Sequence, residues 1–198
     1  MTSKLSEKEL KAFTEFSSAA EEFEKQALKC EKIKTKLIHT SPIVKFLLSE
    51  IALLGTTFNV DNIKCLPCDE TRSGGFAPKY GIVLCQNQIL EKSQLEDTLS
   101  HELVHLYDHA TADVNWNNIR HLACSEIRAV ALSGECKFNR ELKRGYFGIA
   151  KHFQECVRRR AIMGVMQGSG KTQKEAEVAV RSVWQDCFND TSPFDEIF

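Results

Sequence analysis

The sequence predicts an α+β fold in which helices dominate and the β-sheet is small. Apolar residues recur at spacings of three and four along most of the chain, as they do in amphipathic helices. N-capping residues and glycines divide these stretches into separate helices. Only residues 57–85 differ, because they combine turn residues with a short run of β-formers.

The first 55 residues predict two helices. Residues 6–39 form a long amphipathic helix, and a second helix begins at Ser41-Pro42, with Ser as the N-cap and Pro in the first turn. The second helix ends near Gly55. The apolar seam of the first helix consists of Phe13, Phe16, Ala20, Phe23, Ala27 and Cys30.

The next segment predicts the sheet. Residues 57–68 are irregular or strand-like, and Ser73-Gly74-Gly75 is expected to be a turn. Tyr80 to Cys85 reads as a short strand. Within it, residues 82–85 either bind a peptide substrate as an added strand or are simply a core strand.

The second half of the chain predicts a series of helices. The first opens with a capping box at residues 93–96, and Asn117 or Asn118 caps the next, which runs to about Ser133. Further helices are expected at residues 138–146, 149–166 and 173–188, the last behind a capping box at 172–175 and a linker at 168–170. The helix after the first capping box has a buried stripe made of Leu95, Leu99, Leu103 and Leu106.

Charge and hydropathy limit the classes of function. Lys and Arg total 26 against 27 Asp and Glu, so no nucleic-acid partner is expected. The basic run at residues 158–160 is interpreted as a solvated helix face. The longest apolar stretch, 46–54, is much shorter than the roughly 20 residues that span a bilayer. The acidic N-terminus resembles no cleavable targeting peptide.

The cysteine content allows two interpretations. Either the eight cysteines form four disulfides in an oxidising compartment, or they are buried free thiols with one zinc-binding pair at Cys65 and Cys68. Because no secretory signal is visible, the second interpretation is favoured by this observation alone. The cysteines are Cys30, Cys65, Cys68, Cys85, Cys124, Cys136, Cys156 and Cys187.

The motif His101-Glu102-Leu103-Val104-His105 carries the chemistry. Residues four apart lie on one face of a helix, so the two imidazoles can hold one zinc ion. Glu102 then reaches the water on that metal as a general base. The capped helix and its apolar opposite face support this interpretation over two unrelated histidines. The motif therefore predicts zinc-dependent hydrolysis of peptide bonds, with Zn2+ as the cofactor.

A catalytic zinc needs a third protein ligand. The extended metzincin motif is excluded, because Asp108 and Thr111 stand where it requires Gly and His. Glu126, 21 residues after His105, fits the glutamate-zincin layout if its helix packs on the first, and it is the preferred ligand over a simple surface carboxylate. His109 and His121 are the alternatives, although three ligands stacked on one straight helix converge poorly.

Three further residues are candidates around this site. Asp108 lies one turn after His105 and is expected to orient a ligand histidine. Tyr107 and His121 are candidates for stabilising the oxyanion, and each is equally well explained as a packed structural residue.

Several linked motifs resemble one protein family. They are His101 to His109, Asn118 to Ala129, Leu132 to Cys136, Ser73 to Phe76, Val83 to Asn87 and Cys187 to Asp190. Together they closely resemble the mitochondrial inner-membrane metallopeptidases that process the precursor of an ATP synthase membrane-sector subunit. The resemblance covers residues 40–198. Residues 1–40 lie outside the recognised pattern, and the chain ends at Phe198, where some relatives continue.

The resemblance implies a specific function. It implies a zinc endopeptidase of the intermembrane space, attached peripherally to the inner membrane, that trims this precursor and assists assembly of the membrane sector. His101 and His105 match the zinc ligands and Glu102 the catalytic glutamate. The resemblance also implies disulfides made by the oxidative import system, which would explain the cysteines without a presequence.

These observations divide the chain into an N-terminal amphipathic helix, 1–40, and a zinc metallopeptidase domain, 41–198. Two alternatives remain open. The first is an assembly chaperone that does not need proteolysis. The second is a nuclear or cytosolic adaptor protein stabilised by zinc at Cys65 and Cys68.

Overall fold

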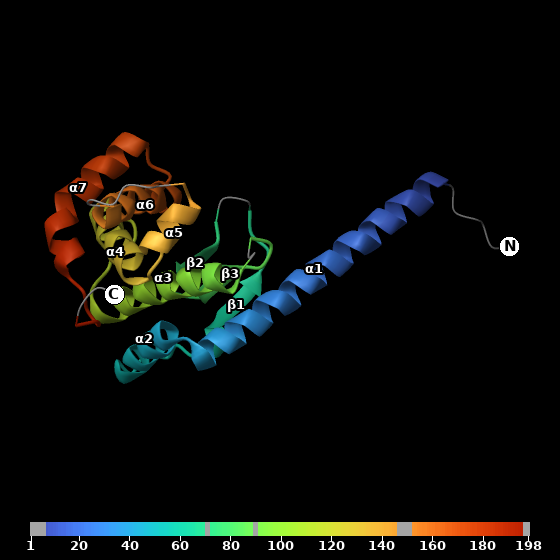
Figure 1. Cartoon of the computed structure of the whole chain (residues 1–198), viewed down its shortest axis with the longest axis horizontal. Helices are drawn as coiled ribbons and strands as arrows, with labels where there is room; N and C mark the ends of the chain where they lie inside the picture. Colours follow the sequence, from blue (N-terminus) through green and yellow to red (C-terminus); the bar gives the residue numbers. More distant parts are fainter. Residues whose placement is uncertain (1–6, 70–71, 89–90, 146–151, 196–198) are drawn as a thin grey trace.

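The computed structural model describes residues 7–69, 72–88, 91–145 and 152–195 and confirms a mostly helical α+β architecture with a small sheet (Figure 1). Helix α3 lies at the centre, between the sheet and α2 on one side and the C-terminal helices on the other. In chain order the elements are α1 (Glu7–Thr40), α2 (Pro42–Leu53), a 3-10 turn (Val60–Asn62), β1 (Ile63–Leu66), β2 (Gly74–Ala77), β3 (Gly81–Cys85), α3 (Lys92–Thr111), α4 (Ile119–Leu132), α5 (Phe138–Lys143), α6 (His152–Ser169) and α7 (Gln173–Asn189).

The sheet has the strand order β1-β3-β2, with β3 parallel to β1 and antiparallel to β2. Both edges of β3 are therefore paired, so the expectation that residues 82–85 accept an added substrate strand is wrong. The edge strand beside α3 is β2.

The predicted turn at Ser73-Gly74-Gly75 is also wrong, because Gly74 and Gly75 begin β2. The close approach of α3 explains why residue 74 is a glycine. A Cβ atom on Gly74 would lie 2.7 Å from the Thr98 Cγ2 atom and 3.0 Å from the Val83 carbonyl oxygen. Glycine here lets the strand lie directly against the helix.

Helix α3 buries the predicted leucine stripe, and all four side chains are at most 6% exposed. Its start differs from the prediction. The helix begins at Lys92 after Glu91, and the Ser93 hydroxyl bonds to the Glu91 carboxylate at 3.3 Å, so the capping box at 93–96 does not form. Packing of the stripe thus holds this helix more than its cap does.

The C-terminal helices follow the sequence closely. The side chain of Asn118 caps α4, and Thr172 and Glu175 form the predicted capping box of α7. Helix α6 continues through the expected linker to Ser169, and the chain turns at Gly170, where φ is +66°. The predicted start of this helix at residue 149 lies outside the described residues. Helices α4, α6 and α7 pack against one another.

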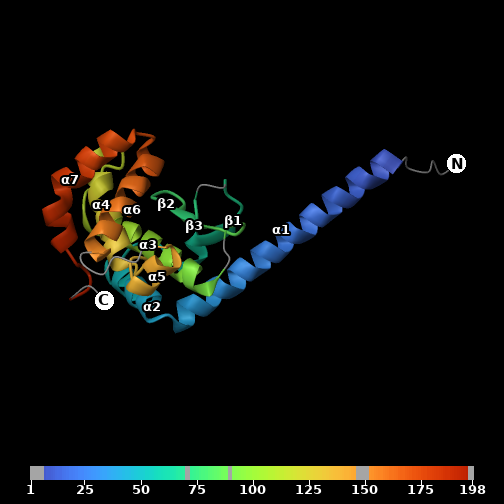
Figure 2. The same ribbon diagram turned by 45° about the horizontal axis from the view of Figure 1, so that its top comes forward.

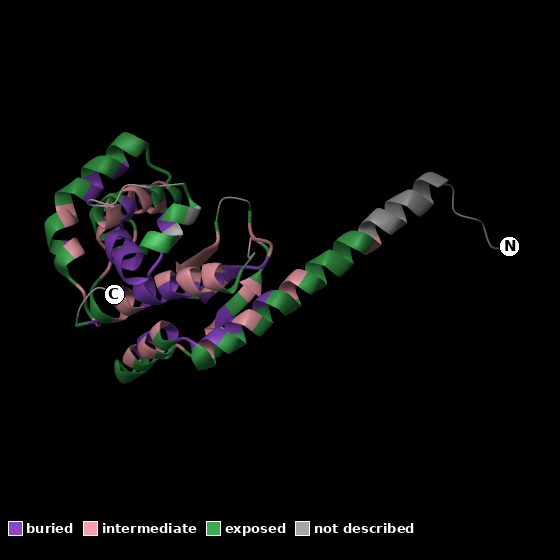
Figure 3. Ribbon diagram, viewed as in Figure 1, coloured by how far each residue is buried: buried purple, intermediate pink, exposed green. Residues whose placement is uncertain are grey.

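Helix α1 projects from the body for much of its length (Figures 1 and 2). Its C-terminal part packs through Cys30, Lys34 and Leu37, and the Lys34 ammonium group donates to the Ile63 carbonyl oxygen at 2.8 Å. The expected apolar seam is exposed farther out, since Phe23 is 48% exposed (Figure 3). The side chains of Phe13 and Phe16 lie outside the described residues.

All eight cysteines form disulfides, which confirms the first of the two interpretations. Cys65 and Cys68 belong to different disulfides, so the predicted zinc pair and the adaptor organised by it are wrong. The pairs are Cys30–Cys65, Cys68–Cys85, Cys124–Cys187 and Cys136–Cys156. Among the described helices, none has the length and apolar character needed to cross a bilayer.

The disulfide between α4 and α7 should stabilise the fold most. Cys124–Cys187 spans 63 residues and Cys68–Cys85 spans 17. Loop-closure entropy predicts losses of about 4 and about 3 kcal/mol, respectively, when each pair is replaced by serine. Urea unfolding of the two double variants measures this difference. Equal losses would contradict the entropic explanation.

Candidate active site

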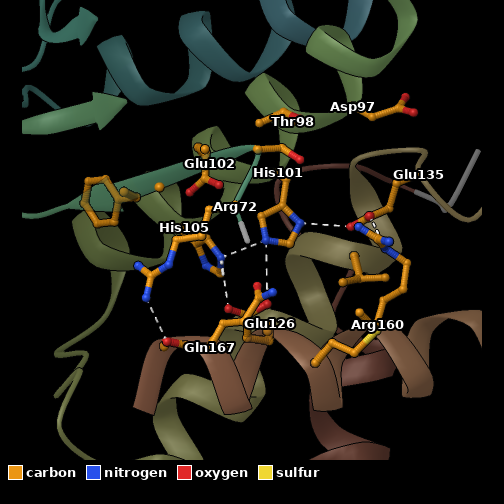
Figure 4. A pocket seen from close by; sticks show the side chains of 18 of the residues that line it. Arg72, Asp97, Thr98, His101, Glu102, His105, Glu126, Glu135, Arg160 and Gln167 are labelled. Carbon is orange, nitrogen blue, oxygen red and sulfur yellow. Dashed lines mark hydrogen bonds and ion pairs between the residues drawn. The ribbon is translucent and has the colours of Figure 1, made fainter. Parts of the chain in front are cut away.

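Three side chains from α3 and α4 converge on one point (Figure 4). The Nε2 atoms of His101 and His105 are 3.0 Å apart. The two carboxylate oxygens of Glu126 lie 3.6 Å from these nitrogens, one from each. All three ligand atoms lie within 4.8 Å of one another. Two imidazoles and one carboxylate are a donor set that suits zinc.

The α3–α4 contact explains this convergence. The motif histidines lie one turn apart on α3, and α4 packs against α3 with Glu126 almost fully buried. The three ligand atoms face a cavity of about 740 Å³. Its walls are formed by β2 and its flanks, α3, α4 and α6.

A buried carboxylate orients His101. Its Nδ1 atom lies 2.9 Å from the Glu135 carboxylate, which also contacts the Arg160 guanidinium group. Arg144 donates to the Glu135 carbonyl oxygen at 2.6 Å. Because the Glu135 carboxylate accepts the Nδ1 proton of His101, Nε2 is the nitrogen that would bind a metal once its own proton has left.

A hydroxyl group orients His105 in the same way. The Ser125 hydroxyl donates to the Asp108 carboxylate at 2.7 Å, so it accepts from Nδ1 of His105, also at 2.7 Å. The proton therefore lies on Nδ1 and the Nε2 lone pair faces the cavity. Asp108 was expected to orient a histidine directly, but the structure places Ser125 between them. Arg128 in turn donates to Asp108 at 2.9 Å.

Neither Ser125 nor Glu135 was identified from the sequence. Ser125 immediately precedes Glu126, so only its position around the axis of α4 indicates which way its side chain points. Glu135 follows the end of α4, and the neighbouring Cys136–Cys156 disulfide ties this loop to α6. No local motif indicates either contact.

Burial and interactions between charged side chains shift the pKa values of Glu102, His105 and His101. Burial raises the pKa of Glu102 to about 7, although the charge of His101 opposes this shift. Burial lowers the pKa of His105 to about 4. Burial also acts to lower the pKa of His101, but contacts with Glu126 and Glu135 outweigh it and raise that pKa well above its usual value. Strongly shifted groups gathered in one cavity are typical of a functional site.

Glu102 lies between the histidine pair and the edge strand β2. Its side chain lines the cavity and accepts a hydrogen bond from the backbone N–H of Phe76 in β2. The carboxylate is therefore held beside the histidines, next to the edge strand of the described sheet.

The other candidates lie elsewhere. Nδ1 of His109 accepts from the Trp116 indole at 3.4 Å, because the next turn of α3 carries it past the cluster. His121 is exposed at the start of α4, where its Nδ1 accepts a hydrogen bond from the backbone N–H of Asn115 at 3.1 Å. Neither histidine nor Tyr107 lines the cavity, so the structure supports no oxyanion contact for Tyr107 or His121.

The basic run at 158–160 is not merely a solvated face, which corrects that expectation. Arg160 contacts Glu135, and Arg159 pairs with the buried Glu141 at 2.7 Å. Arg158 lies over the Trp184 ring at 4.5 Å. One of the three therefore belongs to the support of the histidine pair.

The Glu135→Ala variant tests that support. Removing the carboxylate frees the His101 ring to rotate and to exchange tautomers, so zinc affinity should fall about 10–100-fold. Competition with a chromophoric chelator measures the change. Glu177→Ala, at an exposed position of α7, is the control and should bind zinc as the parent does. Equal affinities for both variants would contradict this role of Glu135.

Comparisons with known proteins agree on one family. Residues 28–195 match the family model described as "Peptidase M76 family". The "Mitochondrial inner membrane protease ATP23" of Yarrowia lipolytica is 46% identical over 175 residues, covering 87% of this chain and 70% of the relative. The proteins of the same name from Emericella nidulans (47%; 86% and 72% covered) and Vanderwaltozyma polyspora (47%; 88% and 74% covered) are equally similar. No solved structure matches the chain.

Proposed function

Because this chain belongs to the Peptidase M76 family, we propose that it is a zinc-dependent endopeptidase that processes the precursor of an ATP synthase membrane-sector subunit. The observation that carries the proposal is the convergence of His101, His105 and Glu126 on a cavity that also contains Glu102. We further propose that the fold is zincin-like, of the glutamate-zincin type, with residues 41–198 as the peptidase domain and residues 1–40 as an appended helix.

The donor set fits a catalytic zinc ion. His101, His105 and Glu126 would hold it, and the cavity leaves room for water and substrate on the open side. When bound there, zinc supplies Lewis acidity towards the scissile carbonyl group and the attacking water. Glu135 and Ser125 fix both rings in the tautomer that this requires.

Glu102 acts as the general base. Its carboxylate accepts a proton from the attacking water and passes it to the leaving nitrogen as the peptide bond breaks. The burial that raises its pKa increases its affinity for the proton it must hold between these two steps. The hydrogen bond from the Phe76 backbone keeps the carboxylate facing the cavity.

The edge strand β2 offers the binding surface for an extended peptide. β3 occupies one edge of β2, and its other edge borders the cavity. A substrate segment could therefore add to the sheet through main-chain hydrogen bonds and pass beside Glu102. Such binding places few demands on side chains, which suits the cleavage of an unfolded N-terminal extension.

We propose the mitochondrial intermembrane space as the location, with peripheral attachment to the inner membrane. The relatives are named mitochondrial inner membrane proteases, and four disulfides suit an oxidising compartment. We also propose that the protein assists assembly of the membrane sector after cleavage.

A reconstituted cleavage assay tests the proposed function. The zinc-loaded protein is incubated with the synthesised subunit precursor in liposomes, and mass spectrometry of the products identifies the new N-terminus. We expect one cleavage that releases the N-terminal extension. The mature subunit is the control and should remain intact. An uncut precursor under these conditions would argue against the proposal.

A further inference from the structure

The carboxylate of Glu126 lies directly against the backbone of Gly164 in α6. A Cβ atom at residue 164 would lie 2.0 Å from Oε2 of Glu126, 2.3 Å from its Cδ and 2.8 Å from its Oε1. These distances are far below van der Waals contact, so no larger residue fits without moving the carboxylate. Gly164 also lines the cavity beside the two histidines.

One helical turn away, Gly168 makes a different contact. The atoms nearest to a Cβ atom there all belong to Leu122, namely its two methyl groups at 3.2 and 3.5 Å and its Cγ at 3.9 Å. Leu122 precedes Glu126 by one turn of α4, so the two glycines face successive turns of the same helix. A leucine methyl group can shift by a few tenths of an ångström. The Glu126 carboxylate has no such freedom, because the two imidazoles lie on its other side.

We propose that Gly164 is a positioning residue for the metal site, which rests on the proposed role of Glu126 as a ligand. The missing side chain lets the α6 backbone support the back of the Glu126 carboxylate and hold it towards His101 and His105. The carboxylate is thereby confined between a helix backbone and two rings. This confinement prepares the third ligand before metal binds.

The backbone at Gly164 does not itself require glycine. The residue lies inside a regular helix, and its φ is not in the left-handed region. Glycine in a helix interior is unfavourable relative to alanine. Alanine should therefore favour the helix at 164, and it should favour it no more at 168, which lies in the last turn of α6. A loss of zinc affinity confined to Gly164→Ala therefore reports the neighbouring side chain.

The experiment compares Gly164→Ala with Gly168→Ala. Zinc affinity is measured by chelator competition, and the absorption spectrum of the cobalt-substituted protein reports the ligand geometry. Gly164→Ala should weaken zinc binding at least about tenfold, in the range seen when a ligand loses its support, and should alter the cobalt spectrum. Gly168→Ala should bind both metals as the parent does. An unchanged affinity and spectrum for Gly164→Ala would overturn the proposal.

A double-variant cycle separates this role from general packing. In a Glu126→Ala background the colliding carboxylate is gone, so Gly164→Ala should cause no further loss of zinc affinity. If Gly164→Ala alone fails to fold, the double variant must fold, and a double variant that also fails would overturn the proposal. If Glu126→Ala itself leaves zinc affinity unchanged, the ligand set is wrong. If Glu126→Ala weakens binding but Gly164→Ala does not, only the role of Gly164 is wrong.

Discussion

The Glu102→Gln variant is expected to lose proteolysis while it keeps its zinc. Glutamine has nearly the same shape but cannot take a proton from the attacking water, so the rate should fall by roughly 10²–10⁴-fold. The metal should stay bound, because Glu102 is not among the three converging ligand atoms. Cleavage of the precursor and the zinc content of the purified variant measure the two properties separately.

The matched control is Glu96→Gln, which makes the same change on α3 outside the cavity. It should cleave the precursor at the parental rate. Loss of zinc from Glu102→Gln would mean that the variant had disturbed the site instead of removing a base. Cleavage at the parental rate by the same variant would show that another group accepts the proton.

The same variant separates proteolysis from assistance in assembly. If the protein also acts as an assembly chaperone, cells that carry Glu102→Gln should still assemble the membrane sector around the uncleaved subunit. Loss of assembly together with cleavage would remove the chaperone alternative, because both functions would then need the base.

Local periodicity explains which parts of the fold the sequence predicted. The leucine stripe of α3 and the caps of α4 and α7 depend on residues within one or two turns, so they are visible in the chain. The predictions that are wrong concern residues whose conformation depends on contacts with segments distant in the sequence. Gly74 was expected in a turn, but the side chain of Thr98 on α3 requires glycine within a strand.

The same distinction applies to the site. The pair His101 and His105 follows from helical spacing, and Glu126 follows from a second helix packing on the first. Glu135 and Gly164 come from a loop and a helix whose contacts with the site have no local signal in the chain. The packing of α6 on α4 and the Cys136–Cys156 disulfide bring Glu135 to His101 and Gly164 to Glu126. Disulfide pairing had no local signal either, since spacing does not choose among the possible partners.

The Glu126→Ala variant should lose zinc more severely than any change in the supporting residues. Its carboxylate supplies the only negative charge among the three converging donors of the described residues. Removing a ligand should lower the zinc affinity by more than the roughly 100-fold that is the upper end for removing a residue that supports a ligand. His109→Ala and His121→Ala are the matched comparisons, because both histidines lie outside the cluster. Chelator competition on the three variants measures the zinc affinities.

Thermal unfolding provides a second test of whether Glu126 is a zinc ligand. Without metal, Glu102, Glu126 and Glu135 are buried close together, and a zinc ion would offset their mutual repulsion. Binding only the folded state stabilises it by about 2.7 kcal/mol at a free zinc concentration 100 times the dissociation constant. Parent, His109→Ala and His121→Ala should all show this rise in Tm, whereas Glu126→Ala should show almost none. If zinc raises the Tm of Glu126→Ala fully but raises that of one histidine variant less, that histidine is the third ligand and Glu126 is not. The reason is that removing a true ligand must reduce the stabilisation that zinc provides.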